Sequence, residues 1–356
     1  MSNSPDGLSS PPRGTIASLS RRKAGIALFV IVGLMISLSQ GRALAADGRA
    51  SPAERLVHAN GVLIVAHRGD NRDYPENTLP AFASAVAMGV DLVELDYHHS
   101  ADGVPVVIHD GTLDRTTDAA KRWSAKKIKV SDKTLVELKQ LDAGSWKGPE
   151  HVGTKLPTLE EALHVIQHGS TTLIERKAGD AATCIDLLRR RGLLGSVVVQ
   201  AFDWKYLADC HRIEPKLVLA ALGGYELTAS KLDKIGASGA RIVVWHHESL
   251  DRKAIQAIHD RGWRAWTFTV NDPRRAKELI KAGIDGIITN EPVKMLALLE
   301  QQGLRARVPP AACHSEPACC RSPARSCHLP RRGGRTCCRG RKRCNSPRFA
   351  GLLNRR

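Results

Sequence analysis

Three observations predict an α/β fold, a closed (β/α)8 TIM barrel that carries a β-hairpin and a small insertion after its second strand. First, short β-branched runs alternate with amphipathic segments from residue 62 onward, which is typical of a mainly parallel sheet covered by helices. Second, the alternation extends over about 240 residues, the usual length of such a barrel. Third, no glycine-rich phosphate loop follows the first run, which makes an open doubly wound sheet the second choice.

The strand-like runs are one more than an eight-stranded barrel needs. In order they are Val62–Ala66, Leu92–Asp96, Val104–Ile108, Thr171–Glu175, Val197–Gln200, Leu217–Ala221, Arg241–Trp245, Arg264–Thr269 and Gly286–Thr289. Only Tyr97–Gly103 separates the second run from the third, which is too short for a parallel crossover, and Asp102-Gly103 is a strong turn signal. We therefore expect the third run to pair with the second as a hairpin, which leaves eight parallel strands.

Amphipathic segments with the helical period stand between most of these runs. They include Leu79–Met88, Leu159–Gln167, Ala181–Arg191, Arg252–Asp260 and Arg274–Ala282. Because they connect one run with a later one, they indicate βαβ units and hence a mainly parallel sheet.

The chain is strongly basic overall, with 53 Lys and Arg against 36 Asp and Glu, but the excess lies at its two ends. Residues 1–46 carry a net charge of +4 and residues 305–356 a net charge of +13, which together account for the whole of the +17. The middle, residues 47–304, is neutral. The net charge is therefore no argument for a nucleic-acid partner of the central domain, and none is expected.

The N-terminus has the pattern of a secretory signal peptide. Arg21-Arg22-Lys23 precedes an uncharged apolar run, Ala24–Leu38, and small residues at Ala43 and Ala45 form a cleavage site. The run is shorter than the roughly 20 residues that a membrane span needs, so an uncleaved anchor is the less favoured alternative. We predict cleavage near Ala45 and an exported protein, periplasmic or secreted, with no stable membrane span once the signal is removed.

The C-terminal end differs in composition from everything before it. Seven of the nine cysteines lie there among Pro, Arg, Gly and Ser, with almost no apolar residues to form a core. We predict that residues 46–304 form the barrel domain and that residues 305–356 form a disordered, basic, Cys-rich tail. The alternative for the tail is an arm that binds nucleic acid or an anionic surface.

Acidic residues gather at the C-terminal ends of two predicted strands, where the active site of a barrel is built. Glu94 and Asp96 are two positions apart and so share one face of their strand, and Glu175 ends the fourth run. Three carboxylates that converge are what a hard divalent cation needs, and without one they would repel each other. The alternative is a set of ion pairs with Arg68 and Lys177.

Two histidines follow neighbouring runs at the same end of the barrel. His67 directly follows the first run, and His109 follows the hairpin partner of the second. Imidazole titrates near neutral pH, as a general base or acid must. Arg68 and Lys177 add positive charge beside them. Together with a cation, these groups suit cleavage of a phosphate ester.

The ordered motifs resemble the glycerophosphodiester phosphodiesterases, barrel phosphodiesterases that are similar to phosphatidylinositol phospholipase C. The resemblance covers about residues 62–299 and rests on His67-Arg68-Gly69, Tyr74–Thr78, Glu94-x-Asp96, Asp102-Gly103, Pro105–Asp110, Arg115–Thr117, Leu156–Glu161, Glu175-x-Lys177, Gln200–Phe202, Trp266, Asn271 and Gly286–Pro292.

The resemblance implies hydrolysis of deacylated phospholipids, such as glycerophosphocholine or glycerophosphoethanolamine, to glycerol 3-phosphate and an alcohol. It implies that Glu94, Asp96 and Glu175 bind Ca²⁺ or Mg²⁺, that His67 accepts and His109 donates the proton, and that Arg68 and Lys177 hold the phosphate. It also places a small insertion at Leu113–Lys155.

The same resemblance extends a substrate-binding role to four further residues. These are Glu76, Asn77, Gln200 and Trp266. Two of them have structural alternatives, because Asn77 could instead cap the first helix and Trp266 could serve barrel packing.

Two departures from the family pattern affect the fine structure of the pocket. His98 and His99 stand where the family has other residues. Because they alternate faces, at most one of them can face the mouth, and we expect both at the periphery. Asn290 replaces the Asp that the family usually has after the last strand.

Two other functions compete with this one. A related lipase-type barrel would act on lysophospholipids or sphingolipids and would favour an apolar rim around the mouth. A non-catalytic protein would use its basic tail to bind a surface or nucleic acid.

Overall fold

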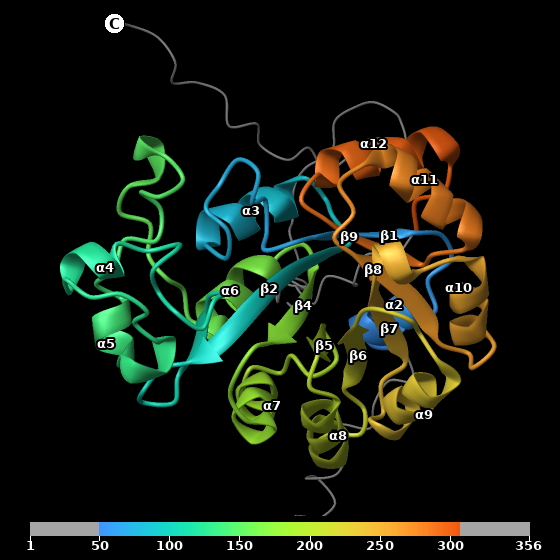
Figure 1. The fold of residues 1–356 in the computed structure, drawn as a ribbon, viewed down its shortest axis with the longest axis horizontal. Helices are drawn as coiled ribbons and strands as arrows, with labels where there is room; N and C mark the ends of the chain where they lie inside the picture. Colours follow the sequence, from blue (N-terminus) through green and yellow to red (C-terminus); the bar gives the residue numbers. More distant parts are fainter. Residues whose placement is uncertain (1–49, 307–356) are drawn as a thin grey trace, which may run out of the picture. The chain divides into compact units, whose positions relative to one another are not determined.

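The computed structural model describes residues 50–306, and Figure 1 shows how their helices and strands are arranged. The predicted signal peptide and residues 307–356 of the predicted tail lie outside the described residues. The strands are β1 (Leu63–Ala66), β2 (Leu92–His99), β3 (Pro105–Val107), β4 (Thr171–Arg176), β5 (Val197–Ala201), β6 (Val218–Gly223), β7 (Ile242–His246), β8 (Arg264–Phe268) and β9 (Gly286–Thr289). The α-helices are α2 (Pro52–Val57), α3 (Leu79–Ala87), α4 (Ala119–Arg122), α5 (Leu135–Leu138), α6 (Leu159–Ile166), α7 (Ala181–Arg190), α8 (Trp204–Ile213), α9 (Ala229–Ala237), α10 (Arg252–His259), α11 (Pro273–Ala282) and α12 (Pro292–Gln302).

Within the described residues, eight parallel strands form a closed ring. The pairing order is β1-β9-β8-β7-β6-β5-β4-β2, and β2 pairs with β1 to close it, as Figure 1 shows. Strand β3 stands outside the ring and pairs with β2 alone, in antiparallel orientation. The predicted (β/α)8 TIM barrel and its hairpin are confirmed.

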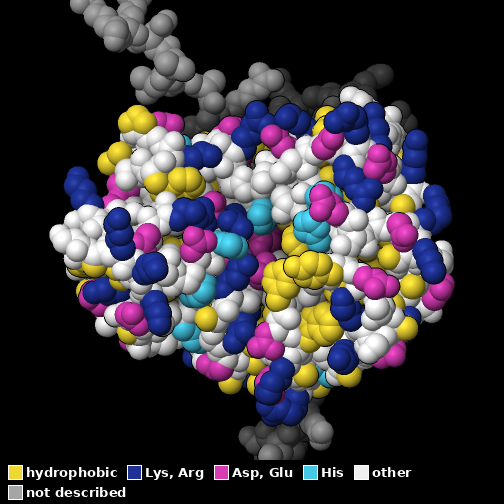
Figure 2. Space-filling view, in the orientation of Figure 1, with side chains coloured by type: hydrophobic (Ala, Val, Ile, Leu, Met, Phe, Trp, Pro, Cys, Tyr) yellow, Lys and Arg dark blue, Asp and Glu magenta, His cyan; other side chains and the backbone are white. Residues whose placement is uncertain are grey.

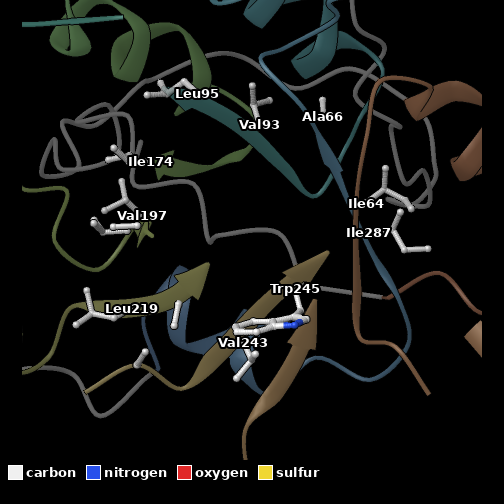
Figure 3. Close-up of a cluster of buried hydrophobic side chains, with 14 of the residues drawn as sticks. Ile64, Ala66, Val93, Leu95, Ile174, Val197, Leu219, Val243, Trp245 and Ile287 are labelled. Atoms are coloured by element: carbon white, nitrogen blue, oxygen red, sulfur yellow. The ribbon is translucent and has the colours of Figure 1, made fainter. Parts of the chain in front are cut away.

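The strand period of two gives the barrel an inner and an outer layer of side chains. Figure 3 shows side chains of the layer between the strands and the helices, among them Ile64, Val93 and Ile174. A separate cluster fills the interior of the ring and includes Leu63, Leu92, Leu173, Val198 and Trp266. Residues that continue the inner positions toward the C-terminal strand ends therefore face the mouth of the barrel.

The predicted elements all form, and the largest difference in a boundary is at the end of β2. The predicted helices end within one residue of the observed ones, while β2 runs to His99 rather than Asp96. The extra residues are held by β3, because Tyr97, His98 and His99 pair with Val107, Val106 and Pro105.

Polar side chains fix where the helices after the parallel strands begin. The first helical turns of α7 to α11 each have a cap whose side chain accepts a backbone N–H, a favourable start for a helix. The caps are Asp180, Asp203, Thr228, Asp251 and Asp272. Each short βα loop thus ends in a defined position beside the barrel mouth.

Between β3 and α6 the chain forms a small lobe outside the ring. It contains α4, α5 and two short 3₁₀ helices, Val130–Asp132 and Pro149–His151. Its own apolar cluster is built from Leu113, Ala119, Val130, Leu138 and Leu141, among others.

None of the helices in residues 50–306 combines the length and the apolar character that crossing a membrane requires.

Candidate active site

Three carboxylates from two neighbouring strands meet inside the barrel. Glu94 and Asp96 lie on the inner face of β2, and Glu175 lies on β4, directly beside Asp96 in the strand register. One ligand oxygen of each side chain lies within 4.8 Å of the others. All three residues are buried. Figure 2 shows acidic side chains in the hollow at the centre of this face, with histidine side chains beside them.

Burial of three like charges changes their protonation. Burial raises the pKa of Glu94 well above its usual range, and the charges of Asp96 and Glu175 add to this rise. Burial and then the charge of Asp96 raise the pKa of Glu175 to about 7. Burial also disfavours the ionised form of Asp96, but Lys177 and Arg68 outweigh it and lower the pKa of Asp96. The fold therefore holds the three carboxylates close together although their ionised forms repel one another.

The cluster has oxygen atoms to offer to a metal ion. In residues 50–306, Glu94 Oε1, Asp96 Oδ1 and Glu175 Oε1 are buried and accept no hydrogen bond of good geometry. Buried acceptors of this kind are rare unless a ligand satisfies them, and an all-oxygen set is the type that Ca²⁺ and Mg²⁺ prefer. The residues present therefore fit a divalent cation.

Two basic side chains border the carboxylates. Lys177 Nζ is paired with Glu175 Oε1 and lies 3.3 Å from Asp96 Oδ1. Arg68 Nε lies 3.4 Å from Asp96 Oδ2, and the Arg68 backbone N–H donates to Glu94 Oε2 at 2.8 Å. The ion pairs that the sequence offered as the alternative to a metal site are thus present, and Lys177 approaches two of the three oxygens that accept no hydrogen bond of good geometry, Glu175 Oε1 and Asp96 Oδ1.

A tight turn after β1 brings Arg68 to this position. Arg68 and Gly69 have φ values of 57° and 78°, so the chain turns through two successive left-handed residues. A Cβ at Gly69 would lie 2.8 Å from the Ala81 carbonyl carbon, which only glycine avoids. The turn therefore needs glycine at position 69.

His67 is held as a neutral ring. Its Nδ1 donates to Asn290 Oδ1 at 2.7 Å, and Asn71 Nδ2 donates to the same oxygen. Burial, and then the charge of Arg68, lower the pKa of His67 to about 4. Nδ1 carries the proton in this arrangement, so Nε2 has a free lone pair.

His109 belongs to a chain of charged side chains that the sequence did not reveal. Its Nδ1 donates to Asp110 Oδ1 at 2.7 Å, and Arg115 donates to both oxygens of Asp110 at 2.7 and 3.0 Å. Arg115 also donates to both oxygens of Glu76, at 2.9 and 2.8 Å, and Glu76 accepts from Arg68 at 2.8 Å. Arg115 holds the pKa of Asp110 well below its usual range, so this carboxylate stays ionised.

In the sequence, Asp110 and Arg115 are noticed only as parts of longer motifs, with no role of their own. The signal that could have revealed them is their spacing, because both follow His109 closely and so can reach its ring from the loop after β3. Glu76, predicted to bind substrate, lies between Arg68 and Arg115 in the structure.

Asn77 lies against a metal-site carboxylate. Its Nδ2 donates to Asp96 Oδ2 at 2.8 Å, and its Oδ1 accepts the Asp96 backbone N–H at 3.2 Å. The helix-cap alternative is wrong, because Thr78 is the N-cap residue of α3.

The remaining predicted site residues lie at different depths. Gln200 Nε2 is 3.4 Å from Glu175 Oε2, so Gln200 joins the carboxylate cluster. Trp266 is fully buried in the barrel interior, and the substrate contact drawn from the resemblance stays a prediction. His98 was expected at the periphery, but its Nε2 donates to the His109 carbonyl at 3.1 Å. His98 therefore lies beside the site.

The charges at this mouth define a class of protein. Lys177 and Arg68 lie beside the carboxylate cluster, and a phosphate is the anion that such groups bind together with a divalent cation. Two histidines beside them supply proton transfer. The class is a barrel phosphodiesterase.

Comparison with known proteins identifies the family. Residues 67–294 match the model of the glycerophosphoryl diester phosphodiesterase family. A glycerophosphodiester phosphodiesterase of Bacillus subtilis (strain 168) is 30% identical over 298 residues, which cover 76% of this chain and 96% of the relative. One from Caldanaerobacter subterraneus is 30% identical over 248 residues, covering 68% of this chain and 99% of that one.

Solved structures agree with the sequence comparison. An Oleispira antarctica phosphodiesterase in complex with the product sn-glycerol-3-phosphate has a TM-score of 0.62 and 28% identity, covering 67% of this chain and 97% of that chain. A glycerophosphodiester phosphodiesterase from Agrobacterium tumefaciens has a TM-score of 0.58 and 29% identity, covering 66% and 99%. The chain belongs to the glycerophosphoryl diester phosphodiesterase family. It is an enzyme that hydrolyses glycerophosphodiesters to glycerol 3-phosphate, as the resemblance implied.

Proposed function

We propose that the enzyme is metal-dependent and acts on deacylated phospholipids such as glycerophosphocholine and glycerophosphoethanolamine. The observation that carries the metal dependence is the buried cluster of Glu94, Asp96 and Glu175, whose ligand oxygens lie within 4.8 Å of one another. These residues would hold Ca²⁺ or Mg²⁺, and the bound ion would supply positive charge to the phosphoryl oxygens as negative charge develops there.

His67 is the proposed general base. Asn290 fixes its tautomer, and the lowered pKa of His67, about 4, leaves the ring neutral at physiological pH. Its free Nε2 takes a proton from the attacking water molecule as the new bond between the water oxygen and phosphorus forms.

His109 is the proposed general acid. As the bond between phosphorus and the leaving oxygen breaks, His109 gives its Nε2 proton to that oxygen and releases the alcohol. Asp110 accepts the Nδ1–H and lies close enough to offset the charge of the doubly protonated ring.

Arg68 and Lys177 are the proposed phosphate-binding groups. Both are partly buried beside the carboxylates, with side chains 16% and 19% exposed, so each can reach an anion at the mouth while still in contact with Asp96. Three neighbouring side chains orient the two basic groups. Glu76 accepts a hydrogen bond from Arg68 itself. Asn77 and Gln200 act through the carboxylates, Asn77 through Asp96 and Gln200 through Glu175.

The experiment is a turnover assay on purified residues 46–304 with glycerophosphocholine. We expect glycerol 3-phosphate to appear when Ca²⁺ or Mg²⁺ is supplied and to stop when EDTA is added. The double variant His67→Ala/His109→Ala, with the carboxylates intact, is the matched control for contaminating activity. Equal turnover with and without EDTA would refute metal dependence, while no product under any condition would refute the substrate.

We further propose that the protein is exported, that residues 1–45 are removed, and that residues 305–356 form a tail that catalysis does not need. The basic and apolar order of residues 21–45 supports export. The mature N-terminus, determined on protein from the envelope or medium, should be Ala46.

Deletion of residues 307–356 should leave turnover of glycerophosphocholine intact, and loss of turnover would favour a functional tail. Arg305 and Ala306 are kept in this test, because Arg305 pairs with Val62 and Ala306 is buried against the barrel.

A further inference from the structure

The turn that follows β1 carries an asparagine, Asn71, whose amide group lies beside the proposed general base. Asn71 Nδ2 donates to the backbone carbonyl oxygen of His67 at 2.8 Å and to Asn290 Oδ1 at 2.7 Å. A side-chain amide nitrogen carries two hydrogens and has no capacity to accept. Both hydrogens of Asn71 are therefore used, one on His67 itself and one on the residue that holds the His67 ring.

The first of these bonds fixes which way the Asn71 amide faces. A side-chain amide donates from its nitrogen and accepts at its oxygen, and the two ends are similar in shape. The backbone carbonyl of His67 can only accept, so the end of Asn71 that faces it has to be Nδ2. With the amide turned over, Oδ1 of Asn71 would lie against the carbonyl oxygen and no hydrogen bond could form.

Asn71 in turn fixes which way the Asn290 amide faces. Because the second hydrogen of Asn71 points at Asn290, the facing atom of Asn290 has to be an acceptor, which is Oδ1. A reversed Asn290 would place two NH₂ groups against each other in a partly buried site, with one hydrogen left without an acceptor. The backbone of Asn290 is held separately, since its N–H donates to Asn271 Oδ1 at 2.8 Å.

The orientation of Asn290 decides where His67 carries its proton. Asn290 Oδ1 lies 2.7 Å from His67 Nδ1, and a neutral imidazole has one N–H and one nitrogen that accepts. With Oδ1 as its neighbour, Nδ1 has to be the donor, and Nε2 keeps its lone pair. With the amide of Asn290 reversed, Nδ1 would have to accept, and the proton would move to Nε2, where a base cannot take up another.

An asparagine at position 290 makes this selection necessary. A carboxylate accepts with either oxygen, so an aspartate there would favour Nδ1–H on His67 whichever way it faced. An amide favours one tautomer in one orientation and the other tautomer in the opposite orientation. Asn71 removes that ambiguity, because it tolerates Asn290 in one orientation alone.

The lobe outside the ring holds Asn71 in place. Lys147 Nζ, from the lobe between β3 and α6, donates to the backbone carbonyl oxygen of Asn71 at 2.7 Å. Three residues further along the turn, the ring of Tyr74 lies 5.7 Å from the ring of His151, centroid to centroid, and His151 also belongs to the lobe. The position of Asn71 thus depends on a part of the chain that is remote from β1 in sequence.

We propose that Asn71 is a positioning residue for the reaction, which selects through Asn290 the tautomer of His67 that can act as a base, and that Lys147 holds Asn71 in this position. The inference rests on the role of His67 in the proposed function. It adds a residue that touches neither substrate nor metal and that acts through hydrogen bonds of one fixed direction.

The first test is a double-mutant cycle with glycerophosphocholine on the full-length chain. Asn71→Ala should lower kcat about 3- to 10-fold and leave KM within about twofold, because the unproductive tautomer becomes accessible. In the Asn290→Asp background the same change should lower kcat less than about twofold, because a carboxylate needs no selection. All values of kcat are taken on the plateau of the pH profile. Asp73→Ala, at an exposed residue of the same turn, is the matched control and should leave kcat unchanged.

The second test observes the tautomer directly and needs no turnover. In protein labelled with ¹⁵N-histidine, a ring nitrogen that carries a proton is distinguished from one that does not, and the signals of His67 are those lost in His67→Ala. We expect Nδ1–H alone in the wild type and in Asn290→Asp, and a mixture with Nε2–H in Asn71→Ala. Lys147→Met should give the same mixture with a smaller share of Nε2–H.

Each outcome decides the proposal. An unchanged kcat in Asn71→Ala, an equal loss in both backgrounds, or a His67 signal that stays entirely Nδ1–H in Asn71→Ala would each overturn it. If Asn71→Ala is not folded at the assay temperature, Asn71→Ser, which can donate only one hydrogen bond, takes its place in both tests. Absence of turnover in the wild type would refute the proposed function, and the ¹⁵N spectrum would still show whether Asn71 selects the tautomer.

Discussion

Asp96 on β2 and Glu175 on β4 are direct partners in the strand register, and both side chains lie inside the barrel. Their proximity follows from the parallel pairing itself, since neighbouring strands place equivalent residues about 4.8 Å apart. Burial, and then the charge of Asp96, raise the pKa of Glu175 to about 7, so ionisation of both carboxylates is unfavourable in the metal-free protein. Occupation by a cation and ionisation of the pair should therefore be linked.

Metal binding should release a proton. Glu175 is largely protonated below its pKa of about 7 in the metal-free protein, and a divalent ion needs the ionised form. Affinity for Ca²⁺ or Mg²⁺ should therefore weaken about 100-fold from pH 8 to pH 5. Titration calorimetry in two buffers with different ionisation enthalpies measures the number of protons released, and a number that is unchanged in Glu175→Gln would contradict this assignment.

Replacing Glu94 with Gln should remove activity and stabilise the metal-free protein. The pKa of Glu94 is higher in the folded protein than in the unfolded chain. The contribution of Glu94 to stability therefore declines as the pH rises above its pKa in the unfolded chain, and at pH 8 its charge is unfavourable. We expect a gain of about 1–3 kcal/mol in the free energy of unfolding with EDTA present, together with a loss of turnover of at least about 100-fold.

Glu76→Gln is the matched control for that experiment. Its pKa is lowered, because Arg115 and Arg68 outweigh the effect of burial, so the same change of charge should destabilise the protein. Urea unfolding in EDTA at pH 8 compares the two variants. A loss of stability in Glu94→Gln would mean that the cluster is not under repulsion.

Asn290 should set the acid limb of the pH profile. With a pKa of about 4, His67 stays neutral as the pH falls, so kcat/KM should decline on its account only near or below pH 4. Asn290→Asp keeps an acceptor for Nδ1 and adds a negative charge, which favours protonated His67 and should move the acid limb to higher pH. Asn290→Ala should lower kcat about 10- to 100-fold with little change in KM. An acid limb that stays in place in Asn290→Asp would exclude His67 as its source.

Asp110 should matter for departure of the alcohol. Asp110→Asn leaves the His109 ring in place but removes the negative charge beside it, and kcat should fall at least about 100-fold for glycerophosphocholine. The deficit should largely disappear with a p-nitrophenyl ester of glycerol phosphate, whose leaving group needs no proton. His67→Ala, as the comparison, should be impaired equally on both substrates. An undiminished deficit of Asp110→Asn on the p-nitrophenyl ester would remove His109 from the role of acid.

The carboxylate cluster could be predicted from the sequence because it depends on local periodicity. Glu94 and Asp96 share a face by the strand period, and Glu175 joins them once the strands are placed side by side in a barrel. Arg68 and Lys177 could also be predicted as part of the site, because they stand next to the ends of the same set of strands.

The sequence could not show contacts that depend on the path of the loops. Glu76 and Arg115 are 39 residues apart and meet because the turn after β1 and the lobe after β3 approach each other across the mouth. Asn77 reaches Asp96 from a left-handed backbone conformation that no pattern announces. On β8 the family resemblance indicates Trp266, which is fully buried, while Phe268, two positions later, packs against the exposed ring of Phe202.

The order of the site residues along the chain has a consequence for how this protein can evolve. The residues proposed for proton transfer, metal and phosphate binding lie between His67 and Lys177, and Gln200 and Asn290 add supporting contacts from the second half of the barrel. The exposed aromatic side chains Phe202 and Tyr225 also lie in that second half. Mutation or recombination there that keeps Gln200 and Asn290 can therefore change which molecules are accepted while the residues proposed for the chemistry are inherited intact.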